Sequence, residues 1–325
     1  MTADIIDITR DHDNALRQAS TVLGEGFPVA IPTETVYGLA ADATNPTAIT
    51  RIYETKGRPR FNPLICHMAD LEMAEHYAEF DPISRKLAET FWPGPLTIIL
   101  PLKPDSGIHS LATAGLDTVG IRLPKGFSSE LIRVFGKPLA APSANTSGKV
   151  SPTSARHVAD DLGEKLKLIV DGGSAPVGVE STIVRVEDSA IRLLRPGGVA
   201  AEEIEKATGL VVIRPEGPAA IIEAPGMLAS HYAPGAAVRL NADHVEADEA
   251  LIRFGSASTK GIEFAKAVFD LSPSGDLAEA ASNLFDYLKR ADATGAAHIA
   301  VSPIPDHGLG EAINDRLARA AAPRE

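Results

Sequence analysis

The chain has 325 residues, of which 44% are hydrophobic and 23% charged, a balance typical of a globular protein with room for two ordinary domains. Its formal net charge of -12 argues against a broad basic surface for non-specific nucleic-acid binding, so an anionic ligand must meet a local cluster of cations. The single cysteine, Cys66, excludes an intrachain disulfide and a multi-cysteine metal site.

The first residues, MTADIIDITRDHD, are acidic and lack the apolar segment of a signal peptide. No stretch approaches the ~20 apolar residues that a membrane span needs. We therefore expect a cytoplasmic protein without membrane contact.

Helical and strand patterns alternate along the first part of the chain, which predicts a twisted α/β layer with a mixed sheet. Helices are predicted from apolar periodicity and from glycine or proline stops at 15–23, 47–57, 81–92, around Glu130 and at 155–162. Short runs rich in valine and isoleucine predict strands at 62–68, 96–100, 118–124, 138–144, 166–173 and 181–186, with 190–198 as a hairpin partner. The stretch 27–43 is predicted as a buried strand that enters a loop.

The composition changes after Gly209, where proline, glycine and alanine become frequent without a clear period. We predict a catalytic α/β domain over residues 1–212, a linker over 213–237 and a smaller, Rossmann-like α/β domain over 238–325. Within the smaller domain, the patterns predict strands at 251–254 and 298–304 and helices along the stripe from Leu277 to Leu288 and at 309–321.

Lys56, Arg58 and Arg60 place three cations at alternate positions in KGRPRFNPLICH, just before an apolar run. In an extended segment, alternate side chains face the same side, so the three would form a clamp for a polyphosphate or a carboxylate-rich ligand. A solvated basic edge is the alternative, because charged residues are mostly exposed. The position at which the chain turns into the core favours a binding site.

Other polar stretches also suit ligand binding. Thr35 and its neighbours in PTETVYG follow a predicted buried strand. Their hydroxyls can hydrogen-bond either to a ligand or to groups of the loop itself. The stretch APSANTSGKVSPT precedes a predicted helix, and it suits a phosphate cradle or ordinary helix capping. Arg122 and Arg195 lie in apolar strands, where a guanidinium needs either a protein carboxylate or an anionic ligand.

Several well-known catalytic motifs are absent from the sequence. It has no P-loop, no G-x-G-x-x-G, no H-E-x-x-H and no nucleophile elbow. The histidines are scattered without zinc-like spacing, so no protein metal site is predicted. Cys66 lies in an apolar run and is predicted as a core residue rather than a nucleophile.

Seven short motifs follow one another along the chain: PTETVYGLAADA, KGRPRFNPLICH, GPLTIIL, TVGIRLP, APSANTSGKVSPT, GVESTIV and LLRPG. Together they resemble the YrdC-like family of threonylcarbamoyl-AMP synthases. The stretch APGMLASHYAP and the second predicted domain are similar to the long, two-domain form of that family. Each motif alone is modestly specific, but their common order extends the resemblance over nearly the whole chain.

The resemblance implies a nucleotidyltransferase that makes threonylcarbamoyl-AMP and pyrophosphate from L-threonine, bicarbonate and ATP, with Mg²⁺ held mainly by the ATP phosphates. The product would serve the modification of adenosine 37 of tRNA through a separate tRNA threonylcarbamoyl transferase complex. Such a reaction needs alignment and charge stabilisation more than acid–base groups, which agrees with the missing catalytic motifs.

The resemblance also assigns residues to the two substrates. The catalytic pair would be Lys56 and Arg58, beside the triphosphate. Contacts with L-threonine would come from Thr35, His67, Arg122, Ala141 and Ser181. Contacts with ATP would come from Arg58, Asn62, Thr118, Ser143, Asn145, Ser151, Arg195 and Tyr232. The planar fork of Arg122 suits the threonine carboxylate, and the resemblance gives Arg60 no role.

The linker stretch PGMLASHYAP is expected to act as a lid with Tyr232 at its tip, because the product is labile to water. Two other functions stay open. One is an RNA-binding module of the same fold, with double-stranded RNA or weak tRNA contact, although the net charge argues against strong binding. The other is a carbamoyl transferase acting on carbamoyl phosphate, but such proteins carry zinc-finger and acylphosphatase segments that this chain lacks.

Overall fold

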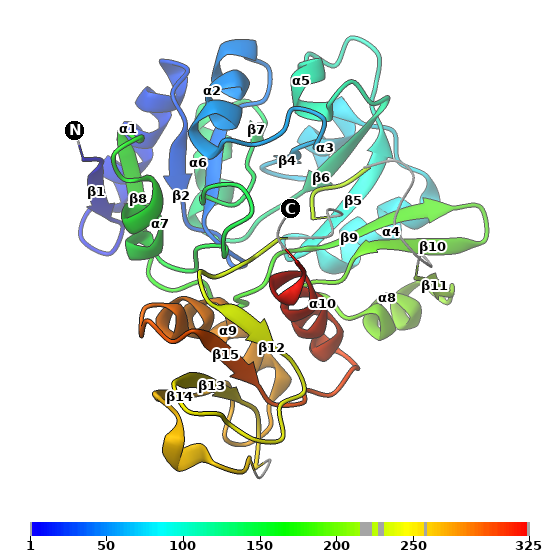
Figure 1. Cartoon of the computed structure of the whole chain (residues 1–325). Coiled ribbons are helices and arrows are strands. Elements are labelled where there is room, and N and C mark those ends of the chain that lie inside the picture. Colours follow the sequence, from blue (N-terminus) through cyan, green and yellow to red (C-terminus); the bar gives the residue numbers. More distant parts are fainter. Residues whose placement is uncertain (1, 215–222, 227–230, 257–258, 324–325) are drawn as a thin grey trace.

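The computed structural model describes residues 2–214, 223–226, 231–256 and 259–323, which form two α/β domains (Figure 1). Within these residues, the strands form an eleven-stranded mixed sheet and a four-stranded parallel sheet. The predicted fold class, a mixed open sheet with helices followed by a smaller α/β domain, is confirmed. None of the helices described is long and apolar enough to cross a membrane.

The large sheet contains, in spatial order, β1 (Asp4–Asp7), β8 (Leu168–Asp171), β2 (Val29–Ile31), β3 (Gly38–Asp42), β7 (Leu139–Ala140), β4 (Ile65–His67), β6 (Thr118–Arg122), β5 (Leu96–Pro101), β9 (Thr182–Glu187), β10 (Ala190–Arg195) and β11 (Val212–Ile213). The pairs β1–β8, β8–β2, β4–β6, β5–β9 and β10–β11 are parallel, and the other neighbours are antiparallel.

The helices of the first domain are α1 (His12–Gly24), α2 (Pro46–Lys56), α3 (Leu71–Tyr77), α4 (Pro82–Phe91), α5 (Ser110–Thr113), α6 (Phe127–Phe135), α7 (Ala155–Leu162) and α8 (Ala201–Thr208). Alternate residues of β2 and β3 bury into two different clusters, because side chains on a strand alternate between the two faces of the sheet. Ala30 and Leu39 pack with α2, whereas Val29 and Ala40 pack with α1 and α6. Helices therefore cover both faces.

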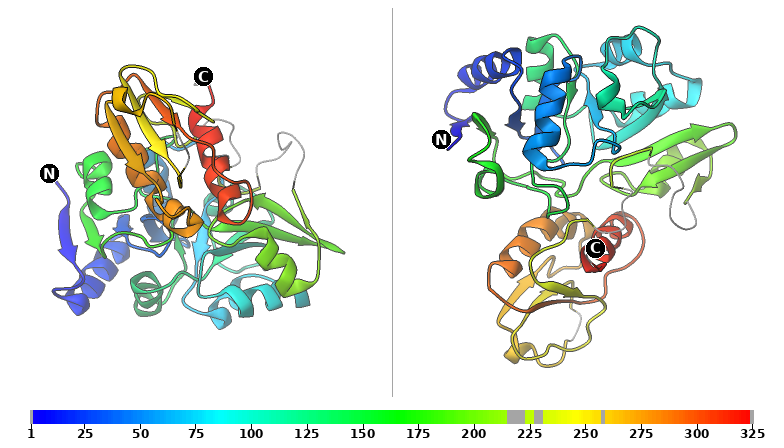
Figure 2. Two further views of the ribbon diagram at one scale, coloured as in Figure 1. Left: turned by 90° about the horizontal axis from the view of Figure 1, so that it is seen from below. Right: turned by 45° about the horizontal axis from the view of Figure 1, so that its top comes forward.

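The second domain consists of β12 (Ala237–Arg239), β13 (Glu249–Arg253), the short helix η1 (Ile262–Phe264), β14 (Ala267–Asp270), α9 (Leu277–Asp292), β15 (His298–Val301) and α10 (Leu309–Ala321). Its parallel strands lie in the order β12-β15-β13-β14. The predicted apolar stripe of α9 is buried, including Leu284, Phe285 and Leu288. Figures 1 and 2 show that α9 and α10 lie on the side of this sheet that faces the large domain.

Two strand predictions differ from the structure. The stretch 138–144 contains only the two residues of β7, because Pro142 has no N–H group to continue the ladder. The stretch 27–43 holds two antiparallel strands, β2 and β3, with the PTETVY loop between them. Residues 215–222 and 227–230 of the predicted linker lie outside the described residues, and the predicted domain boundaries stay predictions.

Candidate active site

A small cavity of about 50 Å³ lies where loops of the large sheet meet the linker. Its lining residues are Thr35, Val36, Arg58, Ile65, His67, Arg122, Ala141, Pro142, Ser143, Glu180, Ser181, Arg195, Pro225, Gly226, His231 and Tyr232. Six of the seven sequence motifs contain or adjoin these positions, so segments far apart in the chain converge here.

Nine residues predicted as site residues line this cavity, namely Thr35, Arg58, His67, Arg122, Ala141, Ser143, Ser181, Arg195 and Tyr232. The sheet topology explains part of this convergence. His67 and Arg122 are register partners at the carboxyl ends of the parallel strands β4 and β6. Ala141 directly follows β7, which pairs with β4, and its N–H donates to the carbonyl of Ile65.

The remaining predicted residues do not line the cavity. Lys56, Asn62, Asn145 and Ser151 are buried, and Ser151 Oγ donates to Oε1 of the lining residue Glu180 at 2.6 Å. Thr118 is at the opposite end of β6 from Arg122, roughly 13 Å away along the strand at about 3.3 Å per residue. The structure therefore does not bring Thr118 to this cavity.

The three cations of KGRPRF do not share one face, so the predicted extended clamp is wrong in its geometry. Lys56 is the last residue of α2, and Gly57 ends that helix with a φ of 61°, a conformation that favours glycine. Arg58 then follows a turn instead of an extended segment. Lys56 and Arg58 are buried, whereas Arg60 is exposed. Only Arg58 of the three lines the cavity.

Lys56 supports the loop that carries the predicted phosphate cradle. Its Nζ donates to the carbonyl oxygens of Ser143 and Asn145, each at 2.5 Å. Burial, and then repulsion by Arg58, lowers the pKa of Lys56 well below its usual value. A polyanion bound beside Lys56 and Arg58 would favour the charged form of the lysine.

Arg58 is fixed by its own loop and still keeps a donor for a ligand. Nη2 donates to the carbonyl of Pro63 at 3.0 Å, and Nε donates to that of Asn62 at 3.4 Å. Burial lowers the pKa of Arg58 to about 10, so the guanidinium stays charged at neutral pH. Its Nη1 has no hydrogen-bond partner within the described residues.

Arg122 has a protein carboxylate as a partner. This was one of the two alternatives predicted from the sequence, the other being an anionic ligand. Its Nη2 lies 2.8 Å from Oε1 of Glu34, and its Nε donates to the carbonyl of Gly94 at 3.2 Å. Beside it, His67 is buried, and burial followed by the charge of Arg122 lowers its pKa well below the usual value. His67 therefore contributes a neutral imidazole.

Arg195 connects the sheet to the linker. Its Nε and Nη2 donate to the carbonyl of Ser181 at 3.1 and 2.9 Å, and its Nη1 donates to the carbonyl of Pro225 at 3.4 Å. Tyr232 is only 1% exposed, and its ring stacks on Phe285 of α9 with ring centres 5.5 Å apart. The described linker residues thus close one side of the cavity.

His231 makes this closure sensitive to pH. The side chain is buried, and burial lowers its pKa to about 3. Above about pH 6.5, the ordinary pKa of histidine, His231 is neutral whether buried or exposed, and its burial has no protonation cost. As the pH falls from 6.5 towards the lowered pKa, an exposed His231 gains a proton but the buried one does not, so the buried arrangement loses stability. We expect a loss of about 1.4 kcal/mol for each pH unit below 6.5.

Amide hydrogen exchange of residues 231–232, corrected for its intrinsic pH dependence, measures this loss. Protection should fall between pH 7.5 and pH 5.5 in the wild type, and it should change little in a His231→Phe variant. Equal protection of the wild type at the two pH values would contradict the prediction.

The sequence reasoning missed two carboxylates of this site, Glu34 and Glu180, and the linker residue His231. Glu34 and Glu180 lie inside quoted motifs, next to apolar and hydroxyl residues. The signal was available, because the buried arginines predicted in apolar strands need anions nearby. Cys66, in contrast, is buried as predicted, and burial raises its pKa to about 12, so it is unsuited to be a nucleophile.

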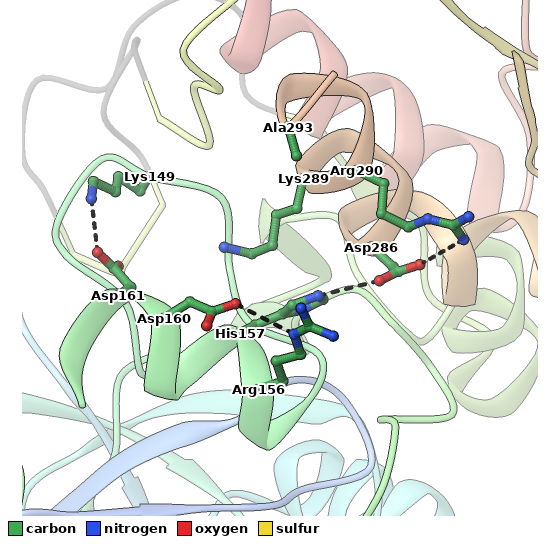
Figure 3. Close-up of a pocket in the computed structure, with 9 residues that line it drawn as sticks. All are labelled: Lys149, Arg156, His157, Asp160, Asp161, Asp286, Lys289, Arg290 and Ala293. Atoms are coloured by element: carbon green, nitrogen blue, oxygen red, sulfur yellow. Dashed lines mark hydrogen bonds and ion pairs between the residues drawn. The ribbon is translucent and has the colours of Figure 1, made fainter. Parts of the chain in front are cut away.

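A larger pocket of about 500 Å³ lies between α7 and α9 (Figure 3). It contains no predicted site residue, and its charges are largely paired with one another. Lys149 Nζ is 2.8 Å from Asp161, and His157 Nε2 is 3.2 Å from Asp286 across the domain interface. We therefore place the candidate active site in the smaller cavity.

Comparisons with known proteins match both domains. Residues 21–197 match the Sua5/YciO/YrdC family model, which is described as "Telomere recombination". Residues 199–322 match the model described as "Threonylcarbamoyl-AMP synthase, C-terminal domain".

Individual relatives cover almost the whole chain. The chain is 42% identical to the threonylcarbamoyl-AMP synthase of Bacillus subtilis, over 99% of this chain and 97% of that protein. It is also 42% identical to the threonylcarbamoyl-AMP synthase of Pyrococcus abyssi, over 95% and 94% of the two chains. The crystal structure of P. abyssi Sua5 complexed with L-threonine matches with a TM-score of 0.88 and 40% identity, covering 98% of both chains.

Proposed function

This chain belongs to the Sua5/YciO/YrdC family, in its two-domain form, and on this basis we propose that it is a threonylcarbamoyl-AMP synthase acting on L-threonine, bicarbonate and ATP. The observation that carries the proposal is the convergence of the residues predicted for both substrates on one cavity. They include Arg58 and Arg195 for the nucleotide, and His67 and Arg122 for the amino acid.

The proposed reaction needs no protein nucleophile. Bicarbonate takes up a proton and loses water to give CO₂, to which the neutral amine of threonine adds. The nitrogen releases one proton to solvent, which leaves a carbamate, and a carbamate oxygen then attacks the α-phosphorus of ATP. The bond from that phosphorus to the bridging oxygen breaks, and pyrophosphate leaves. What the protein must supply is alignment and positive charge where negative charge develops. Arg58 has an available donor for this task, and Lys56 holds the carbonyls of Ser143 and Asn145 in place beside it.

Magnesium would enter as part of the ATP substrate. The described residues contain no group of three or more histidine, cysteine, aspartate or glutamate side chains that could hold a metal ion. Glu180, a carboxylate on the cavity wall, is already engaged by Ser151 and Arg316. The phosphate oxygens of ATP are therefore the ligands that we propose for Mg²⁺.

The threonine end of the site is proposed at His67 and Arg122. Oε1 of Glu34 and Nη2 of Arg122 form an ion pair, but neither atom has a hydrogen-bond partner within the described residues. Nη1 of Arg122 has no hydrogen-bond partner there either. This nitrogen can donate to the threonine carboxylate. A neutral His67 can accept from or donate to the amine or hydroxyl of threonine without adding charge.

The described parts of the linker support its proposed role as a lid. The carbonyl of Pro225 accepts the hydrogen bond from Nη1 of Arg195, a donor that the nucleotide would otherwise use. Tyr232 packs against Phe285 of the second domain. A cavity of about 50 Å³ is too small for ATP, because ligand sites are typically about 300–1,000 Å³. We propose that this segment moves aside for ATP and closes over the labile product.

Pyrophosphate release tests the function. The wild-type protein should release pyrophosphate from Mg·ATP only when L-threonine and bicarbonate are both present, and omitting either should return the rate to background. A rate that is indifferent to threonine would reject the synthase function. Carbamoyl phosphate in place of bicarbonate should give no product, which separates this function from a carbamoyl transferase.

The product is proposed to pass to a separate tRNA threonylcarbamoyl transferase complex in the cytoplasm, where ATP and the other substrates are present. Direct contact with tRNA or double-stranded RNA stays a weaker proposal. The net charge of -12 predicts weak binding, and a steep dependence of tRNA affinity on salt would be needed to support it.

A further inference from the structure

Arg316 of the second domain is a charged side chain buried at the back of the candidate active site. It lies on α10 and is 0% exposed. Its Nε is 2.8 Å from Oε2 of Glu180, and its Nη2 donates to the carbonyl of Pro196 at 2.9 Å. Its Nη1 donates to Asp315 of the same helix. A guanidinium without access to water needs such partners, so its position is tightly specified.

Glu180 connects Arg316 to Ser151 and Arg195, two residues predicted to bind ATP. Its second oxygen, Oε1, accepts the hydrogen bond from Ser151 Oγ at 2.6 Å. The next residue, Ser181, holds Arg195 through its carbonyl and its hydroxyl. Burial by itself raises the pKa of Glu180, but the charges of Arg316 and then Arg195 lower it to about 2, so this carboxylate is ionised at neutral pH.

Apolar contacts connect the same loops to the second domain. Val36, Val150 and Val179 belong to the buried cluster formed with α9 and α10, and each is adjacent in sequence to Thr35, Ser151 or Glu180. The backbone also approaches closely, because a Cβ atom at Gly178 would lie 2.3 Å from the carbonyl of Ala281 on α9. Three active-site loops are therefore packed on the second domain.

We propose that Arg316 is a positioning residue for the nucleotide site, acting through Glu180 on Ser151 and Arg195. This proposal rests on the proposed function. The second domain then does more than cover the cavity, because its α10 sets the geometry of ATP contacts made by the first domain. Arg316 also lies over the ring of Tyr232, 5.2 Å from its centre, so the same side chain contacts the linker.

The test compares Arg316→Met, Arg316→Lys and the control Arg214→Met in the full-length protein. Arg214, at the start of the predicted linker, forms an exposed ion pair with Glu311 of α10, with Nε and Oε1 2.7 Å apart. The control therefore also removes a charged contact of α10. We expect Arg316→Met to raise the KM for ATP about tenfold and to change the KM for threonine less than twofold. Arg316→Lys should recover part of the ATP affinity, and Arg214→Met should leave both values unchanged.

A double variant distinguishes positioning from loss of folding. Glu180→Gln removes the charge that Arg316→Met leaves unpaired, so the double variant should bind ATP no more weakly than Arg316→Met alone. An ATP KM within twofold of wild type in both Arg316 variants would overturn the proposal. Equal increases in both KM values, with additive effects in the double variant, would also overturn it and indicate a merely structural role.

Calorimetric binding of ATP separates this proposal from the proposed function, because it needs no turnover. If the wild type binds ATP but makes no product, and Arg316→Met weakens that binding, the function fails and the role of Arg316 stands. If the wild type turns over normally and Arg316→Met binds ATP as tightly, the role of Arg316 fails alone.

Discussion

An Arg58→Ala variant is expected to release pyrophosphate about a hundredfold more slowly than the wild type, or slower still. Arg58 lines the cavity, is held by the carbonyls of Asn62 and Pro63, and keeps Nη1 available for a phosphate. Removing a fixed donor at the position where charge develops typically lowers kcat by about 10²–10³. The rate at saturating ATP, threonine and bicarbonate measures the effect.

Arg60→Ala is the matched control for this prediction. Arg60 is two residues away in the same stretch but is exposed, so its loss should leave the rate unchanged. Arg58→Lys keeps the charge as a single point donor and should recover only part of the rate. A rate for Arg58→Ala within threefold of the wild type would remove Arg58 from its proposed role.

An Arg122→Ala variant should chiefly raise the threonine requirement. We expect a threonine KM about thirtyfold higher, which corresponds to the lower end of the ~2–5 kcal/mol seen when one partner of a buried charged contact is removed. The KM for ATP should change less, because Arg122 is the register partner of His67 at the proposed threonine end of the cavity, and the proposed ATP contacts Arg58 and Arg195 remain in place. Steady-state kinetics with each substrate varied in turn gives both values.

The ion pair with Glu34 complicates this variant and also provides its control. Removing Arg122 leaves Glu34 buried without its cation, which destabilises a protein by about 3–5 kcal/mol. A second variant, Arg122→Ala with Glu34→Gln, removes that unpaired charge and should recover the melting temperature but not the threonine KM. An unchanged threonine KM in the double variant would mean that Arg122 serves only the ion pair.

The sequence was informative wherever one local rule decided the structure. The helix predicted at 47–57 is found at Pro46–Lys56, because Asn45 caps its first turn and Gly57 ends it. The alternate spacing of Lys56, Arg58 and Arg60 led to the wrong prediction that the three side chains share one face. The two-residue period of an extended strand does not apply across the end of a helix. Local spacing alone could not show that Lys56 would turn towards the carbonyls of the 143–145 loop.

Long-range partners were harder to predict than local elements. Arg316 lies on the apolar stripe of α10, between Ile313 and Leu317, and this placement on a buried face could have identified it as an arginine that needs an anion. The sequence could not reveal that its anion is Glu180, more than a hundred residues earlier. Pairings of this kind depend on how two domains pack, which no periodicity records.

The small volume of the cavity has a kinetic consequence. At about 50 Å³ it is several-fold smaller than the roughly 300–1,000 Å³ of a typical ligand site. If ATP binds at this cavity, as we propose, the observed positions of Pro225 and Tyr232 must give way when the nucleotide enters, and each turnover would then need an excursion of these two residues. If that excursion is the slowest step, the turnover number will fall as the medium becomes more viscous, while the chemistry at the α-phosphorus stays unaffected.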